Sequence, residues 1–153
     1  MKRILFVCLG NICRSPLAEA IFQDKVGNLE MESDSAGTAA YHIGENPDHR
    51  SVKVAQENNV PINHKARKFV PEDLDRFDYI IAMDQNNYDD MVGIAGRDSD
   101  KLLLLRSFDP FANGNLNVPD PYYGGYEGFE NIFDIISRSV DPFIIHIQNE
   151  SEK

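Results

Sequence analysis

The sequence contains no tryptophan and only two cysteines among its 153 residues. Two cysteines cannot form the disulfide scaffold of a small secreted domain, and by themselves they cannot make a four-ligand zinc site. Basic residues are also scarce, because 15 Lys and Arg face 25 Asp and Glu and the formal net charge is −10. A protein that binds nucleic acid without sequence preference needs a basic face. The composition argues against that class of protein, and nucleic acid is not an expected partner.

Long hydrophobic runs are absent as well. The longest one, from Ile4 to Gly10, is far shorter than the roughly 20 apolar residues of a membrane-spanning helix. No small-residue cleavage site follows it, so no signal peptide is predicted. We interpret the run as the first buried strand of a cytoplasmic protein without a membrane partner.

The hydrophobic fraction of 42%, with nine Phe, predicts a folded chain with a substantial core. Short apolar strands alternate with longer helices. The expected strands are 2–7, 31–35, 79–83 and 101–105, and the expected helices are 15–26, one beginning at 47–48, 84–95 and 126–148. Pro142 is expected to end or kink the last helix.

Apolar strands separated by helices indicate a parallel sheet that is covered on both faces. The sequence therefore predicts one α/β domain over residues 1–153, a doubly wound four-stranded parallel sheet with helices on both faces. Ligands in such sheets bind at the carboxyl ends of the strands, near a switch in strand order. The first such end in the chain is Val7-Cys8.

Segment 8–16 lies between the first strand and the first helix. Gly10 permits close approach of the backbone and Asn11 tolerates a left-handed conformation, so the segment can curl and point its N–H groups inward at an anion. Arg14 offers a planar pair of donors to two phosphoryl oxygens, and the helix that follows adds its positive dipole end. The same field favours the thiolate of Cys8. The Cys-x5-Arg-Ser spacing is the signature of cysteine phosphatases, and it predicts a phosphate-binding loop after the first strand.

Three Asp-Pro pairs are candidates for a general acid: Asp109-Pro110, Asp120-Pro121 and Asp141-Pro142. Asp141 falls inside the last helical stripe, and Asp109 follows a strand closely enough to be an ordinary turn. Asp120 lies deep in the long loop 108–125, and loops of that length are usually functional. Two tyrosines follow it and could form a substrate wall. These patterns favour Asp120 only modestly.

Segment 7–16 resembles the opening of the low-molecular-weight protein tyrosine phosphatases. Other segments resemble that family in the same order along nearly the whole chain: 34–38, 44–48, 64–67, 77–80 with 83–84, and 120–124. The resemblance implies that Cys8 is the nucleophile, that Arg14 binds the phosphoryl group, and that Asp120 is the general acid. The implied substrates are phosphotyrosine proteins or aryl phosphates, and phosphate and other oxyanions are implied inhibitors. No cofactor and no metal are implied.

The resemblance also implies roles for residues around these three. Ser35 and His64 would support the loop through Asn11, and Cys8 and Cys13 would form a redox pair. Ser15 could hydrogen-bond the thiolate, cap the helix, or do both, and Tyr41 could stack on a phosphotyrosine ring or be a plain loop tyrosine. The implied substrate-binding residues are Leu9, Gly10, Asn11, Ile12, Cys13, Ser15, Tyr41, Tyr122 and Tyr123.

Two other functions compete with this interpretation. A thioredoxin-coupled arsenate reductase shares the loop, but its chemistry requires further cysteines downstream, and the chain has only Cys8 and Cys13. A non-catalytic phosphate-binding module would keep Arg14 but would need neither Cys8 nor Asp120. The sequence leaves the physiological substrate and the oligomeric state open.

Overall fold

The computed structural model describes residues 1–152. Its strands are β1 (Lys2–Cys8), β2 (Met31–Gly37), β3 (Tyr79–Ala82) and β4 (Leu102–Leu104). Its helices are α1 (Arg14–Val26), α2 (His49–Glu57), α3 (Asp73–Arg76), α4 (Gln85–Ala95), the 3-10 turn η1 (Leu105–Phe108) and α5 (Tyr126–Ser151). All four predicted strands and all four predicted helices are present, while α3 and η1 were not predicted.

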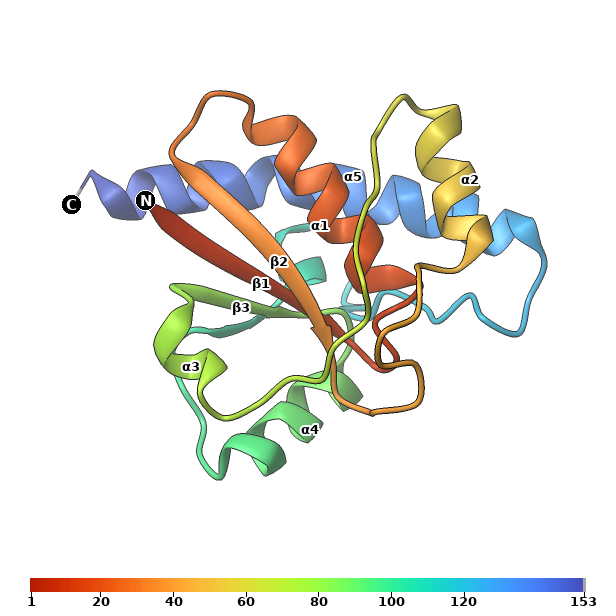
Figure 1. Cartoon of the computed structure of the whole chain (residues 1–153). Coiled ribbons are helices and arrows are strands. Elements are labelled where there is room, and N and C mark those ends of the chain that lie inside the picture. The colour runs from red at the N-terminus through yellow and green to blue at the C-terminus, as the bar shows by residue number, and fades with distance from the viewer. Residues whose placement is uncertain (153) are drawn as a thin grey trace.

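The four strands form one parallel sheet in the order β2-β1-β3-β4. The chain adds β2 on one side of β1 and then crosses to add β3 and β4 on the other side. The switch in strand order therefore lies at β1, and its carboxyl end opens where two crossovers diverge. Figure 1 shows the connection from β1 to α1 at that end of the sheet. The predicted doubly wound architecture is confirmed.

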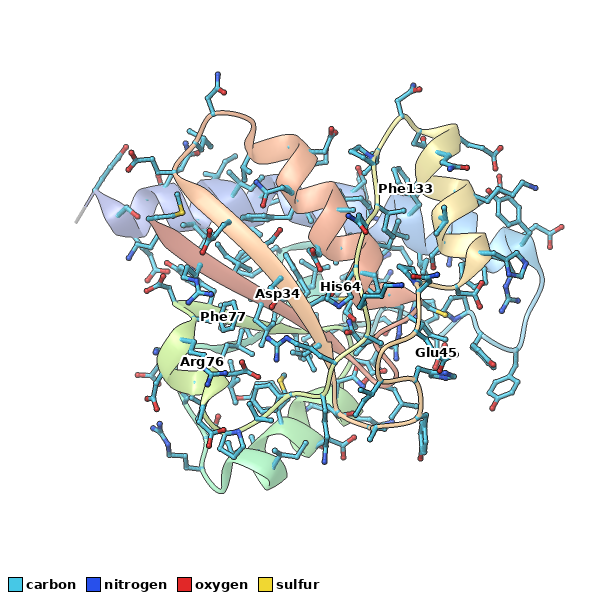
Figure 2. All side chains as sticks on the ribbon, in the orientation of Figure 1. Asp34, Glu45, His64, Arg76, Phe77 and Phe133 are labelled. Carbon is cyan, nitrogen blue, oxygen red and sulfur yellow. The ribbon has the colours of Figure 1, made fainter. Side chains whose placement is uncertain are left out.

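Helices cover both faces of the sheet. Helices α1, α2 and α5 pack on one face over Phe6, and α3 and α4 pack on the other over Val7 (Figure 1). Figure 2 shows side chains filling both layers, with Phe133 on the α5 side and Phe77 on the α3 side. Because β1 is buried on both faces, its apolar residues run without alternation, as the sequence pattern indicated.

Helix α5 continues through Pro142, so of the two expected effects, an end or a kink, the helix does not end there. Proline removes one backbone donor and crowds the preceding turn. Phe143 and Ile144 directly after it are buried against the sheet, and this burial offsets the lost bond. In the described residues, 1–152, no helix has both the length and the apolar character needed to cross a bilayer.

Candidate active site

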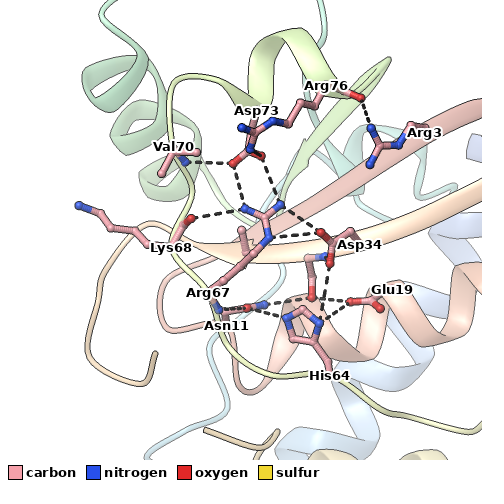
Figure 3. A network of polar contacts seen from close by, with 12 residues as sticks. Arg3, Asn11, Glu19, Asp34, His64, Arg67, Lys68, Val70, Asp73 and Arg76 are labelled. Atoms are coloured by element: carbon pink, nitrogen blue, oxygen red, sulfur yellow. Dashed lines mark hydrogen bonds and ion pairs between the residues drawn. The ribbon is translucent and has the colours of Figure 1, made fainter. Parts of the chain in front are cut away.

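Asn11 determines the shape of the loop between β1 and α1. Its backbone has a φ of 60°, in the left-handed region, as the sequence indicated. Its side-chain amide donates to the hydroxyls of Ser15 (2.8 Å) and Ser35 (3.0 Å), and its Oδ1 accepts from His64 Nε2 (2.8 Å) and from the backbone N–H of Arg67 (2.9 Å). Four partners on three segments of the chain hold this strained residue in place (Figure 3).

A buried polar network extends behind Asn11. His64 Nδ1 lies 3.2 Å from Glu19 Oε1 and 3.8 Å from Asp34 Oδ1, and these three atoms lie within 4.8 Å of one another (Figure 3). Burial raises the pKa of Glu19 to about 7 and lowers the pKa of His64. Glu19 also accepts from Ser35, and Asp34 pairs with Arg67. Because each carboxylate already has a protein partner, the cluster is explained as loop support.

The Cys8 sulfur lies at the base of the loop, 2% exposed and 3.0 Å from Ser15 Oγ. Ser15 Oγ already accepts from Asn11, and its other neighbour, the carbonyl of Ala36, is 3.4 Å away. Ser15 Oγ is therefore hydrogen-bonded to the Cys8 sulfur, with which it shares the shorter of these two contacts. Ser15 does not cap α1, because the N-cap residue is Cys13 and no side chain caps it. The structure favours the first of the two predicted roles.

Arg14 is buried, with 3% of its side chain exposed. Its Nη1 donates to Asp84 Oδ2 (2.6 Å) and to the carbonyl of Val118 (2.9 Å), and its Nη2 lies 3.8 Å from Asp120 Oδ2. Burial opposes the charge, but the neighbouring Cys8, Asp84 and Asp120 outweigh burial and raise the pKa of Arg14 above its ordinary value. The guanidinium is therefore a fixed, permanently charged group at the loop.

A cavity of about 250 Å³ opens at this point. Its lining brings together residues from three separate parts of the chain, and the exposed rings of Tyr41 and Tyr123 form its rim. Asn11 and Ser15, which were also expected to bind substrate, are not among the residues that line it. The lining residues are Cys8, Leu9, Gly10, Ile12, Cys13, Arg14, Tyr41, His42, Asp120, Tyr122 and Tyr123.

Of the three Asp-Pro pairs, the structure brings Asp120 to the cavity, with 41% of its side chain exposed. Asp141 lies on the surface of α5 and pairs with Lys25. Asp109 is fully enclosed and binds the guanidinium groups of Arg106 and Arg138. Burial alone would raise the pKa of Asp109, but the bonds from Arg138, the Phe111 N–H and Arg106 lower it to about 2. A carboxyl that stays ionised in this way cannot donate a proton near neutral pH.

We expect Asp109→Asn to destabilise the fold by about 3 kcal/mol, because it leaves the buried guanidinium of Arg106 and the partly exposed guanidinium of Arg138 without their shared carboxylate. The effect depends on pH. The pKa of Asp109 is lower in the folded than in the unfolded chain, so its stabilisation is present above about pH 4 and is lost as the pH falls toward 2. Urea unfolding at pH 7 and at pH 2.5 measures both effects. Equal stability of the two proteins at pH 7 would contradict this account of the ion-pair network.

Three residues of the site were not identified from the sequence. Asp84 caps α4 by accepting from the Asn87 N–H, and it also holds Arg14. His42 lines the cavity against Gly10, and its Nδ1 bonds Glu45. Glu19 was overlooked in a helix of mixed composition. A signal did exist for Asp84, because it closely follows the end of β3, the neighbour of β1, and the carboxyl ends of parallel strands meet at one edge.

A curled loop at the switch point of a doubly wound sheet, with a cysteine at its base and a buried arginine beside it, is the arrangement expected of a phosphoric monoester hydrolase. The family profile described as low molecular weight phosphotyrosine protein phosphatase matches residues 3–153. The chain belongs to this family, and the resemblance seen in the sequence segments is confirmed.

Relatives of similar length are found in bacteria and animals. A low molecular weight protein-tyrosine-phosphatase of Streptomyces coelicolor is 40% identical, with 98% of this chain and 96% of the relative covered. The human low molecular weight phosphotyrosine protein phosphatase is 39% identical over 94% of both chains.

Solved structures agree with this assignment. A protein tyrosine phosphatase of Entamoeba histolytica, crystallised with Hepes in its active site, superposes with a TM-score of 0.92 at 35% identity, covering 99% of both chains. A structure titled drosophila arginine phosphatase superposes with a TM-score of 0.87 at 33% identity, covering 96% of this chain and 98% of that one.

Proposed function

We propose that residues 1–153 act as a single catalytic domain that hydrolyses phosphotyrosine and other aryl phosphate monoesters through a phosphocysteine on Cys8. The observation that carries the proposal is the convergence of Cys8, Arg14 and Asp120 on one cavity, with Ser15 Oγ hydrogen-bonded to the sulfur. A binding module would need only Arg14 and the loop.

In the first step, the thiolate of Cys8 attacks phosphorus in line with the leaving oxygen. The three equatorial oxygens carry the charge of a loose transition state. Arg14 and the loop N–H groups bind these oxygens, and their fixed positions stabilise that charge without reorganisation. Protonated Asp120 donates its proton to the leaving phenolate.

In the second step, the ionised Asp120 removes a proton from a water molecule that attacks the phosphocysteine. The sulfur–phosphorus bond breaks, phosphate is released and the Cys8 thiolate is restored. Phosphate and vanadate, which would bind to the same loop N–H groups and to Arg14, are the expected inhibitors.

The cavity wall supports an aromatic substrate. Ile12 and the rings of Tyr41 and Tyr122 line it, and flat apolar surfaces of this kind pack against a phenyl ring. The structural relative titled arginine phosphatase raises phosphoarginine as a competing substrate. A guanidinium group needs a carboxylate partner, and within residues 1–152 the cavity wall offers Asp120 alone. Comparison of phosphotyrosine with phosphoarginine, phosphoserine and phosphopeptides tests this choice, and faster turnover of phosphoarginine would reject it.

Asp120→Asn is expected to lower kcat/KM for phenyl phosphate by about 10²–10³-fold, within the range of general acid catalysis. The loss should be much smaller for para-nitrophenyl phosphate, because an acidic phenol leaves without a proton. Initial rates across a series of substituted phenyl phosphates measure this dependence.

Asp109→Asn is the matched control, since it makes the same chemical change at another Asp-Pro pair. It should show no dependence on the leaving group. The assignment of the acid would be wrong if the control showed the dependence and Asp120→Asn did not.

We propose, in addition, that Cys13 protects Cys8 from irreversible oxidation. Both thiols are free and buried, and both line the cavity. Peroxide converts the Cys8 thiolate to a sulfenic acid. Cys13 then attacks that sulfur, forming a disulfide and releasing water, before the sulfinic stage is reached. We propose that the protein is cytoplasmic. The cytoplasm keeps thiols reduced, so a disulfide between Cys8 and Cys13 could be reversed there. Burial, together with the charge of Asp48, raises the pKa of Cys13, so capture should become faster as the pH rises.

The wild-type enzyme treated with peroxide should lose activity and recover most of it with dithiothreitol. Cys13→Ser should lose activity at a similar rate but recover several-fold less. Peptide mass mapping of the oxidised wild type should reveal a link between Cys8 and Cys13. Equal recovery of both proteins without such a link would reduce Cys13 to a packing residue.

A further inference from the structure

Arg50, in the first turn of α2, holds the segment that follows Asp120. Its Nη2 donates to the carbonyl of Tyr122 (3.0 Å), and its Nη1 donates to the carbonyl of Gly124 (3.2 Å). The guanidinium also lies over the ring of Phe129, 4.4 Å from the centroid. One side chain from α2 thus binds two backbone carbonyls of the loop and the start of α5.

Asp48 fixes the orientation of Arg50. Its two carboxylate oxygens accept from Arg50 Nε and Nη2, each at 3.0 Å, and its Oδ1 also caps the helix by accepting from the Arg50 backbone N–H (2.9 Å). This fork-to-fork pair adds geometric specificity to the attraction between the charges. Only 23% of the Arg50 side chain and 9% of the Asp48 side chain are exposed, so solvent screens the pair little.

The same turn of α2 also binds the phosphate-binding loop. The backbone N–H of Asp48 donates to the carbonyl of Ile12 (2.8 Å), and the buried hydroxyl of Ser51 donates to the carbonyl of Cys13 (3.1 Å). The first turn of α2 therefore contacts both halves of the cavity. It fixes the loop that carries Cys8 relative to the loop that carries Asp120.

Asp120 lies between two anchored carbonyls. Arg14 holds the carbonyl of Val118 on one side, and Arg50 holds that of Tyr122 on the other. The carboxylate itself accepts only a local bond from the Tyr122 N–H, at 3.1 Å, and lies 3.8 Å from Arg14. Segment 109–125 contains no helix or strand. The Val118 N–H also donates to the carbonyl of Met83 (2.8 Å), so the backbone before Asp120 is held by Arg14 and Met83, and the backbone after it by Arg50.

We propose that Arg50 is a positioning residue for Asp120, and that it sets the distance between the carboxyl group of Asp120 and the leaving oxygen. The proposal rests on the proposed role of Asp120 as the general acid. A general acid acts only within hydrogen-bond reach of the atom it protonates, and a displacement of about 1 Å can cost about 10²-fold in rate. Loss of Arg50 should therefore impair leaving-group protonation selectively, while Arg14 and the loop N–H groups continue to bind the phosphoryl group.

The test compares Arg50→Gln with Lys53→Gln, which removes the same charge from an exposed position on the same helix. The value of kcat/KM reports the steps through formation of the phosphocysteine. Arg50→Gln should lower it for phenyl phosphate about tenfold more than for para-nitrophenyl phosphate. Inhibition by orthovanadate should change by less than about threefold. Lys53→Gln should match the wild type in all three measurements.

Arg50→Lys keeps the charge and is the second variant, for use if Arg50→Gln folds poorly. A point charge cannot bridge two carbonyls and a carboxylate, so the same dependence on the leaving group is expected at reduced size. In the Asp120→Asn background, Arg50→Gln should add less than about threefold, because both changes remove one function.

Equal losses for both substrates, or a matching loss of orthovanadate affinity, would overturn the role of Arg50. Asp120→Asn assayed in parallel separates the two proposals. If Asp120→Asn shows no dependence on the leaving group, the proposed general acid fails. If Asp120→Asn shows the dependence and neither Arg50 variant does, only the inference about Arg50 fails.

Discussion

Cys8→Ser should abolish turnover of aryl phosphates, with a loss of about 10⁴-fold or more in kcat, as expected when a nucleophile is removed from a unit that acts together. A serine hydroxyl is un-ionised at neutral pH and is a weak nucleophile without an adjacent base. The loop N–H groups and Arg14 remain in place, so phosphate should bind with nearly unchanged affinity. Steady-state assays and titration calorimetry with phosphate measure the two properties separately.

Cys13→Ser is the natural control, because it makes the same change at the other thiol of the cavity. It should keep activity within about tenfold of the wild type, since only Cys8 is proposed to bond to phosphorus. Substantial turnover by Cys8→Ser, or abolition of activity by Cys13→Ser alone, would reject the phosphocysteine mechanism.

Arg14→Lys should lower kcat by about 10³-fold, the scale seen when a guanidinium that stabilises a transferring phosphoryl group is lost. The charge is conserved, but an ammonium cannot donate two parallel bonds to two oxygens. Asp84 makes the substitution worse, because its carboxylate, now 2.6 Å from the guanidinium, would hold the compact ammonium away from the substrate.

The measurements for Arg14→Lys are kcat and the inhibition constant of orthovanadate, which should both worsen. Asp84→Asn provides a second comparison, since it releases the guanidinium without removing it and should impair the enzyme far less. Activity of Arg14→Lys within tenfold of the wild type would show that a point charge suffices at this position.

The fold was predictable because the signals are local. Buried strands such as β1 are continuous apolar runs, and Asp48 and Asp84 cap the helices that they precede. The short α3 and η1 carry too few residues for a periodic pattern. Pro142 does not end α5, since its local penalty is outweighed by the burial of the helix, which no local rule includes.

The site was predictable where its residues are neighbours in the chain. The loop from Cys8 to Ser15 carries its own signature, and Asn11 takes the left-handed conformation expected of it. His42 and Arg50 gave no such signal, because their roles depend on segments that meet only in the folded chain. The choice among the Asp-Pro pairs had the same difficulty. Two arginines form ion pairs with Asp109 and exclude it as the acid, but these partners cannot be recognised from spacing alone.

The partners of Asn11 and Arg14 also bear on when activity appears during folding. The loop from Cys8 to Ser15 is short in sequence, but the hydrogen bonds that shape it come from Ser35, His64 and Arg67. The guanidinium of Arg14 is likewise held by Asp84 and by the carbonyl of Val118. Each contact closes a long segment of chain, which carries an entropic cost and forms late. A chain emerging from the ribosome therefore exposes Cys8 as an ordinary thiol until more than half of its length has been made. Competence to bind an anion then arises together with the native packing, as a late and cooperative event.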